Sequence, residues 1–110
     1  MPNNLHAVFG ALSDPTRMAI VERLIREGET SAGDLAQPFA MSKPAISRHL
    51  RVLEDSGLVA KRINRQFRMF SIQRAAVNEI GDWIEEQRKF WNASFDRLEA
   101  VLEQSETKQK

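Results

Sequence analysis

Cysteine and tyrosine are both absent from this 110-residue chain, and only two histidines occur, His6 and His49. Without cysteine the protein can form no disulfide, no thiolate metal site and no thiol redox sensor. The two histidines are too far apart in sequence to supply the ligand spacing of a zinc site. The sequence therefore predicts no bound metal and no cofactor.

Catalytic groups and long apolar runs are also missing. No histidine lies near a serine and an aspartate at a recognisable spacing, so we expect no enzymatic activity. No apolar run is long enough to span a bilayer, and no charged-then-apolar leader is present. We expect a cytoplasmic protein that does not contact membranes.

The positive charge is concentrated in one part of the chain. Residues 42–68 contain seven basic and two acidic side chains, a net charge of +5. The other residues contain nine basic and thirteen acidic side chains, a net charge of −4. A basic face of this kind is typical of a protein that binds nucleic acid phosphates.

The pattern of helix caps and apolar residues predicts a mainly α fold with a small β-hairpin, in the order α-α-α-α-β-β-α. Asp14 before Pro15 is typical of a helix start, and Gly28 of a helix end. Ser31 and Ser42 are suited to cap two further helices, and a turn is expected at Asn64-Arg65-Gln66. The expected helices are residues 3–12, 15–27, 32–37, 42–56 and 75–104, and the expected strands are 58–64 and 67–72.

At this length we expect one domain over residues 1–104, followed by a flexible polar tail at 105–110. Its DNA-reading part would be residues 31–72. Within that part, Ile46, Leu50 and Leu53 form an apolar stripe on one side of the fourth helix, and Arg48 and Arg51 lie on the opposite side. A short helix with an apolar back and a basic front is suited to a DNA major groove.

The last helix carries more apolar surface than one small core requires. Its apolar arc is about 160° wide, and a helix that faces one core needs roughly 100°. We expect the surplus to bind the same helix of a second copy. Trp83 and Trp91 also admit a second interpretation, in which they line a ligand pocket.

Three short motifs, in this order and spacing, resemble those of the ArsR family of bacterial repressors: Ser-Asp-Pro-Thr-Arg at 13–17, Ser-Arg-His-Leu at 47–50 and Gly-Leu-Val at 57–59. The resemblance implies a winged helix-turn-helix homodimer, joined through its first and last helices, that represses transcription from an inverted-repeat operator. On this basis the recognition helix would be residues 42–56 and the wing 58–72. The DNA-binding residues would be Ser42, Lys43, Ala45, Ser47, Arg48, Arg51, Arg62, Asn64, Arg65, Gln66 and Arg68. The dimer interface would include Leu5, Val8, Phe9, Ile84, Trp91, Phe95, Leu98 and Leu102.

Two departures from the family pattern affect these expectations. Metal-sensing members carry Cys-x-Cys on the third helix, where this chain has Ser31-Ala32-Gly33-Asp34, and no histidine lies beyond His49. The chain therefore resembles the cysteine-free, SdpR-like branch, which does not respond to metals. An organic ligand, a partner protein or a falling protein concentration would then release it from DNA. The family wing usually turns at glycine, whereas this one turns at residues that include Asn64, which tolerates a left-handed conformation.

Two alternatives remain at the level of the sequence. Winged helices also serve as protein–protein interaction modules, such as antitoxins or adaptors, although a docking wing has no reason to concentrate basic residues. His49 lies nearer the apolar stripe than the basic front of its helix, which favours a packed or capping histidine over a phosphate contact.

Overall fold

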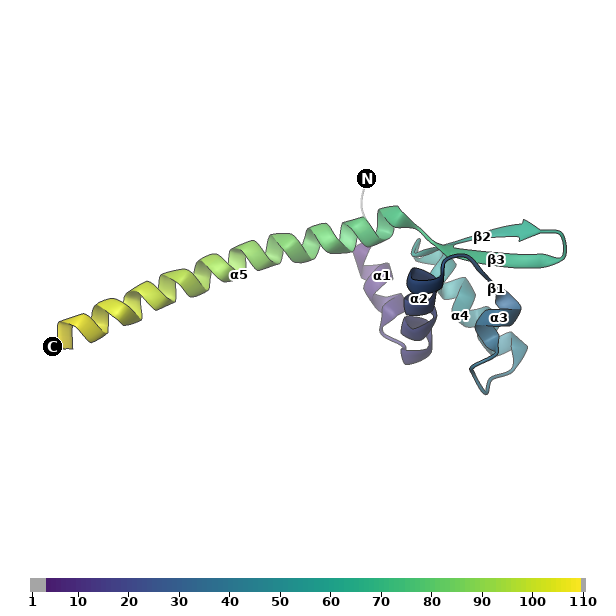
Figure 1. Cartoon of the computed structure of the whole chain (residues 1–110), viewed down its shortest axis with the longest axis horizontal. Coiled ribbons are helices and arrows are strands. Elements are labelled where there is room, and N and C mark those ends of the chain that lie inside the picture. Colours follow the sequence, from purple (N-terminus) through teal and green to yellow (C-terminus); the bar gives the residue numbers. More distant parts are fainter. Residues whose placement is uncertain (1–3, 110) are drawn as a thin grey trace. The chain divides into compact units, whose positions relative to one another are not determined.

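The computed structural model describes the backbone of residues 4–109 and the side chains of residues 4–105 (Figure 1). The elements follow the order α1, α2, β1, α3, α4, β2, β3 and α5. The chain divides into two compact units, the first ending at Glu79 and the second beginning at Ile80 within α5. The mainly helical fold with a hairpin is confirmed, and a short third strand is added to it.

The first two helices are delimited by the residues that the sequence indicates. α1 is Leu5–Leu12, so it begins after residue 3; Asn3 lies outside the described residues. α2 is Pro15–Glu27, and the Asp14 carboxylate accepts a hydrogen bond from the backbone N–H of Arg17. This bond satisfies one of the amide groups that a helix start leaves without an intrahelical partner. Gly28 ends α2 with φ of 83°, a conformation that favours glycine.

A three-stranded antiparallel sheet with the order β1-β3-β2 lies in the first unit. β2 is Val59–Asn64, and β3 is Phe67–Ile72. β1, Thr30–Ser31, pairs with Phe70 and Met69 of β3 and was not expected from the sequence. Two residues are too few to show the alternation that identifies a strand, and their pairing depends on a segment almost forty positions further along the chain.

The helix-turn-helix packs against this sheet. α3, Ala32–Ala36, is capped by the Ser31 hydroxyl, and α4, Lys43–Asp55, by the Ser42 hydroxyl. The predicted apolar stripe of α4 is confirmed, because all three of its members are buried. The core of the first unit consists of Val8, Ala11, Ile20, Val21, Leu24, Leu35, Ile46, Leu50, Leu53, Leu58, Val59, Phe70 and Ala76.

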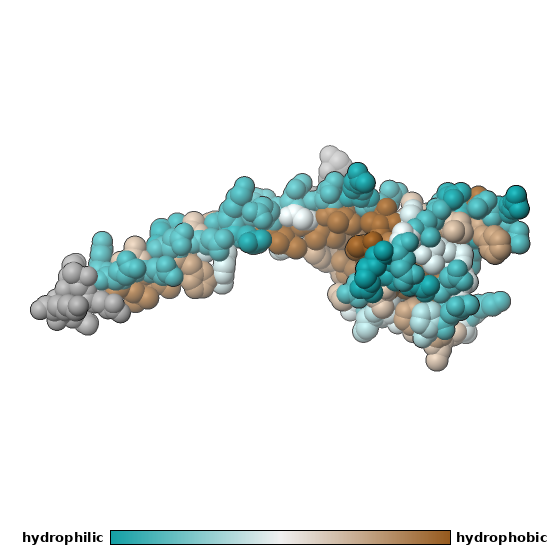
Figure 2. All heavy atoms as spheres, in the orientation of Figure 1, coloured by the Kyte–Doolittle hydropathy of each residue, from teal (hydrophilic) through white to brown (hydrophobic). Residues whose placement is uncertain are grey.

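α5, Arg74–Gln109, is a 36-residue helix and longer than expected. The predicted flexible tail, residues 105–110, is helical as far as Gln109, and Lys110 lies outside the described residues. Glutamate, glutamine and lysine favour helices, and neither glycine nor proline interrupts this segment. Apolar side chains gather along one side of α5 and hydrophilic ones along the other (Figure 2). Those on the apolar side are exposed in the single chain, among them Ile84, Phe90, Trp91, Phe95, Leu98, Val101 and Leu102.

Candidate nucleic-acid interface

The outer side of α4 carries the basic residues predicted for the recognition helix. Lys43, Arg48 and Arg51 are exposed, whereas Ala45 and Ser47 are half-buried at the edges of this side. Within the described part of the chain, neither Arg48 nor Arg51 has an ion-pair partner. Their guanidinium groups are therefore available to an anionic ligand.

The register of the hairpin divides the wing side chains between two faces. Residues opposite each other in antiparallel strands share a face, and neighbours along a strand alternate. Lys61 lies opposite the buried Phe70, and Ile63 opposite Arg68, so these residues share the face that packs on the core. Arg62 lies opposite Met69 and Asn64 opposite Phe67, so these residues share the other face.

Two grooves lie between α4 and the wing. One, of about 150 Å³, is lined by Arg48, Arg51, Lys61 and Arg68, with Glu54 as its acidic residue. The other, of about 300 Å³, lies beside the start of α4 and brings Lys43 and Ser47 together with Gln66, Phe67 and Arg68. The structure thus brings together most of the basic residues that the sequence singled out, from segments about 20 positions apart.

The tip of the wing is a two-residue loop, because Asn64 pairs with Phe67 and leaves Arg65 and Gln66 between the strands. Arg65 has φ of 59°, and among the described residues it is the only non-glycine with a positive φ. A positive φ at the first loop position alone is what a type II′ turn requires, and glycine usually occupies it. The residue in the left-handed conformation is therefore Arg65, and not Asn64, which the sequence indicated as tolerant of it.

Two of the wing cations are already paired with acids. The Arg62 guanidinium donates two hydrogen bonds to the Glu29 carboxylate, Nε to Oε2 and Nη2 to Oε1, each at 2.7 Å. These bonds hold the pKa of Glu29 below its usual value and raise the pKa of Arg62. Lys61 Nζ lies 3.8 Å from Glu54 Oε1 of α4. Lys61 is thus near the recognition helix, whereas Arg62 is bound to a residue next to β1.

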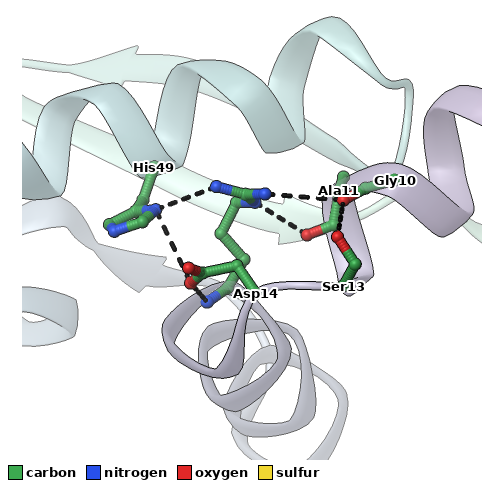
Figure 3. Close-up of polar contacts among 6 residues, drawn as sticks. Gly10, Ala11, Ser13, Asp14 and His49 are labelled. Atoms are coloured by element: carbon green, nitrogen blue, oxygen red, sulfur yellow. Dashed lines mark hydrogen bonds and ion pairs between the residues drawn. The ribbon is translucent and has the colours of Figure 1, made fainter.

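His49 connects the recognition helix to the corner between α1 and α2 (Figure 3). Arg17 Nη1 lies 3.2 Å from His49 Nδ1, and Arg17 Nε donates to the Ala11 carbonyl at the end of α1 at 2.7 Å. Asp14 Oδ2 lies 3.8 Å from the same histidine nitrogen. The hydrogen bond from the backbone N–H of Arg17, together with the nearby His49, lowers the pKa of Asp14 from 3.8. The ring is half-buried, as the packed interpretation of His49 predicts.

Comparison with known proteins shows the family to which this fold belongs. A helix-turn-helix domain family matches residues 12–62. The transcriptional repressor SdpR of Bacillus subtilis strain 168 is 35% identical over 80 residues, which cover 73% of this chain and 88% of that protein. The arsenical resistance operon repressor of Staphylococcus xylosus is 33% identical over 90 residues, 82% of each protein. The crystal structure of an ArsR family transcriptional regulator matches with a TM-score of 0.76 at 35% identity, and covers 81% of this chain and 97% of that one. The chain belongs to the ArsR family.

As an ArsR-family protein, the chain is a DNA-binding transcriptional regulator with a winged helix-turn-helix fold and is not an enzyme. The ArsR family, the winged helix-turn-helix fold and the function as a DNA-binding transcriptional regulator, all predicted from the sequence, are confirmed. In the part of the chain that the structure describes, no helix combines the length and apolar character needed to cross a bilayer. No cluster of three or more potential metal-binding side chains (His, Cys, Asp or Glu) occurs there either.

The residues predicted for an ArsR-type dimer interface differ in exposure. Val8 is only 2% exposed and belongs to the core of its own chain, so its predicted place in the dimer interface is wrong. Leu5 is half-buried, and Phe9 is exposed. On α5, Trp91 is 62% exposed and packs edge-on against Phe95 with ring centroids 4.9 Å apart. Helical spacing alone did not distinguish Val8 from Phe9, because both lie next to each other on a helix with few polar residues.

Sequence reasoning missed two residues that shape this interface. Glu29 lies just before β1, outside every motif, and only the fold brings it to Arg62. Arg17 was seen as part of a motif, but its contacts with Ala11 and His49 depend on how α1, α2 and α4 pack. No signal in a single sequence predicts either contact, since the partners of Glu29 and of His49 are more than 30 positions away.

Proposed function

We propose that this protein is a homodimeric repressor that binds an inverted-repeat operator and does not respond to metals. The observation that carries the proposal is the basic groove between α4 and the wing, lined by Arg48, Arg51, Lys61 and Arg68. Four cations on facing walls fit a polyanion whose charge continues beyond the groove. DNA binding of this kind would take place in the bacterial cytoplasm.

In this proposal the start of α4 enters the major groove. Arg48 and Arg51, on its exposed side, would contact base edges or phosphates, and Lys43 a phosphate. Ser42, Ala45 and Ser47 would lie against the DNA at the start and edges of the same helix. From the wing, Arg65, Gln66 and Arg68 would reach the backbone or the minor groove, with Asn64 beside them.

A second copy of the chain would cover the apolar side of α5. Ile84, Phe95, Leu98 and Leu102 are each 44–55% exposed in the single chain, and Trp91 more so. Exposed apolar side chains aligned along one helix mark an interaction surface. From α1, Leu5 and Phe9 would join this interface, since both retain exposed surface. Two-fold symmetry would then present two copies of α4 to two operator half-sites.

The operator can be found by selection of bound duplexes from a random pool, followed by titration across a salt series. We expect a two-fold symmetric sequence whose half-site centres lie about 34 Å apart, or a multiple of that distance. The affinity should fall steeply with salt as phosphates regain their counterions. The doubly substituted Arg48→Ala, Arg51→Ala variant provides the control and should select no sequence. Equal affinity for a single half-site would contradict the dimeric part of the proposal, and salt-insensitive binding its electrostatic basis. The absence of any selected duplex would favour a protein–protein docking role.

Metal independence is tested by the same titration with zinc, cadmium, arsenite, copper(I) or peroxide in excess. Metal sensors place Cys, His or clustered carboxylates within about 2–2.6 Å of the ion. This chain has no cysteine, and its only histidines are His6 and His49. We expect unchanged operator affinity in every case, so that release depends on an organic ligand, a partner protein or dilution. A loss of affinity that one metal causes and a chelator reverses would overturn this part of the proposal.

A further inference from the structure

The Glu29–Arg62 pair differs from the other ion pairs of the described residues in its geometry. Both guanidinium-to-carboxylate hydrogen bonds measure 2.7 Å, whereas the remaining ion-pair distances lie between 3.3 and 3.8 Å. Two parallel hydrogen bonds fix the relative orientation of a guanidinium and a carboxylate, which a single contact between charges does not. Arg62 is therefore already held in one place before any DNA arrives.

The pair crosses the sheet from one edge strand to the other. β3 is the central strand, with β1 and β2 on its two sides. Met69 of β3 pairs with Ser31 of β1 and with Arg62 of β2. Glu29 comes just before β1, and its carboxylate reaches Arg62. β1 has only two residues, so few backbone hydrogen bonds hold this side of the sheet, and the side-chain pair adds to them.

Arg62 also lies on the wrong side of the hairpin to line the basic groove. It shares a face with Met69, whereas the groove residues Lys61 and Arg68 share the face of the buried Phe70. The hairpin is thus held on both faces, by Lys61 near Glu54 of α4 on one and by Arg62 with Glu29 on the other. Two side-chain contacts on opposite faces restrain how the wing tilts relative to α4.

We infer that Arg62 is a positioning residue, and that its bond to Glu29 sets the wing angle at which Arg65 and Arg68 meet DNA. The inference rests on the proposed function, because it assumes that the wing contacts the operator. In this arrangement Arg62 neutralises no phosphate, and Glu29 acts only through Arg62. The alternative, in which Arg62 leaves Glu29 to bind a phosphate, gives the opposite results in the following test.

The test measures operator affinity and its salt dependence for Arg62→Ala and for Glu29→Gln, which keeps the shape of Glu29. If Arg62 only positions the wing, both variants should lose affinity by a similar factor, at most about fivefold for an exposed pair. The combined variant should lose no more than either alone, because both changes remove the same contact. The slope of log affinity against log salt should equal that of the wild type, since no phosphate contact is lost.

The charge-reversed double variant Glu29→Arg, Arg62→Glu decides between the two roles. It keeps the net charge, and a positioning pair should recover most of the lost affinity in either orientation. A phosphate-binding Arg62 would instead make this variant weaker than Arg62→Ala. In that case Glu29→Gln would raise affinity, and Arg62→Ala would lower the salt slope by about 1.8, which is about 0.9 for each subunit of the dimer. Any one of these three results would overturn the inference.

Two controls keep the outcome interpretable. Arg68→Ala should lower both the operator affinity and the salt slope. If it changes neither, the wing does not bind DNA. That part of the proposed function then fails together with the inference. If Arg68→Ala behaves as expected and Arg62→Ala also lowers the slope, only the inference fails. Amide hydrogen exchange in the free protein supplies a readout without DNA. Exchange in β2 and β3 should accelerate in Glu29→Gln and return toward wild type in the charge-reversed variant, and unchanged exchange in Glu29→Gln would contradict the inference.

Discussion

At the scale of single residues, the corner between α1 and α2 shows how one motif fulfils several roles. Asp14 caps α2, and Arg17 joins the Ala11 carbonyl at the end of α1 to His49 of the recognition helix. The side chains of the motif residues Ser13, Asp14 and Arg17 thus make contacts within the chain, and the Ser13 hydroxyl donates to the Gly10 carbonyl at 2.6 Å. Arg17 and Asp14 lie against His49 of α4, whereas Ser13 contacts the end of α1.

The lowered pKa of Asp14 makes a prediction about stability and pH. A carboxyl group with a lower pKa in the folded state stabilises the protein above its unfolded pKa, and this contribution is lost as pH falls through the folded value. The Asp14→Asn variant retains a good cap but has no charge to titrate. The difference in unfolding free energy between wild type and variant should be constant above about pH 5, and should shrink as pH falls below 3.8. Chemical denaturation at several pH values measures it, and a difference independent of pH would contradict the assignment.

Arg65 provides a second prediction at this scale, because its φ of 59° is unfavourable for a side chain with a Cβ. Arg65→Gly and Arg65→Ala both remove the guanidinium, but only glycine removes the Cβ. We expect the glycine variant to be more stable than the alanine variant by about 1 kcal/mol. Thermal or urea unfolding of the pair checks this. Equal stabilities would show that the loop relaxes without strain.

At the scale of elements, the proposed function divides the contacts to DNA between α4 and the wing. α4 is rigidly seated, since Ile46, Leu50 and Leu53 are all buried, and its outer side can be held in register with base pairs. The wing is a hairpin whose last pair is Asn64 with Phe67, and its tip projects beyond the part that packs on the core. A rigid element favours base recognition, whereas a projecting hairpin favours contacts with the sugar–phosphate backbone.

This division predicts different effects for Arg48→Ala and Arg65→Ala. Loss of Arg48 should relax discrimination at particular base pairs, at a cost of roughly 1–3 kcal/mol if it contacts a guanine edge. Loss of Arg65 should weaken all sequences more evenly. The measurement is the affinity of each variant for the operator and for every single-base change in it. If both variants lose affinity equally for all sequences, Arg48 is only a phosphate contact.

At the scale of the whole molecule, the apolar side of α5 accounts for most of the large exposed apolar residues of the described chain. Eight of them lie between Trp83 and Leu102, and Trp83 and Trp91 are the bulkiest. A surface of this kind is stable in water when a partner covers it. We have proposed a second copy, because a two-fold operator needs two copies of α4 in fixed relation.

The Leu98→Glu variant tests this proposal. It would place a charge without a partner in an apolar interface, so we expect a monomer in sedimentation and an operator affinity lowered at least about tenfold. Ala100→Glu adds the same charge two residues further on, about 200° around the helix, and should remain a dimer. Circular dichroism confirms that both variants fold. A folded Leu98→Glu variant that stays a tight dimer would show that this side of α5 does not form the interface.

The sequence by itself determined the features that depend on neighbours in the chain. Helix caps at Asp14, Ser31 and Ser42 act over three residues, and the stripe of α4 repeats every turn, so both could be predicted and both are present in the structure. Each motif that indicated the ArsR family is a short run of neighbouring residues, and the order and spacing of the three along the chain can also be read without the fold. The extended end of α5 was within reach of such reasoning too, because its residues favour helices.

Only the tertiary structure decided the features that depend on distant segments. β1 forms because Thr30 and Ser31 pair with Phe70 and Met69. Arg62 donates hydrogen bonds to Glu29 because the sheet brings the two residues together. The register of the hairpin placed Arg68 in the basic groove and Arg62 on the other face, although both are arginines of the wing with the same charge. Charge and composition are summed along the chain, whereas binding depends on which face each side chain occupies. That choice is made by strand pairing and core packing, which a local pattern does not contain.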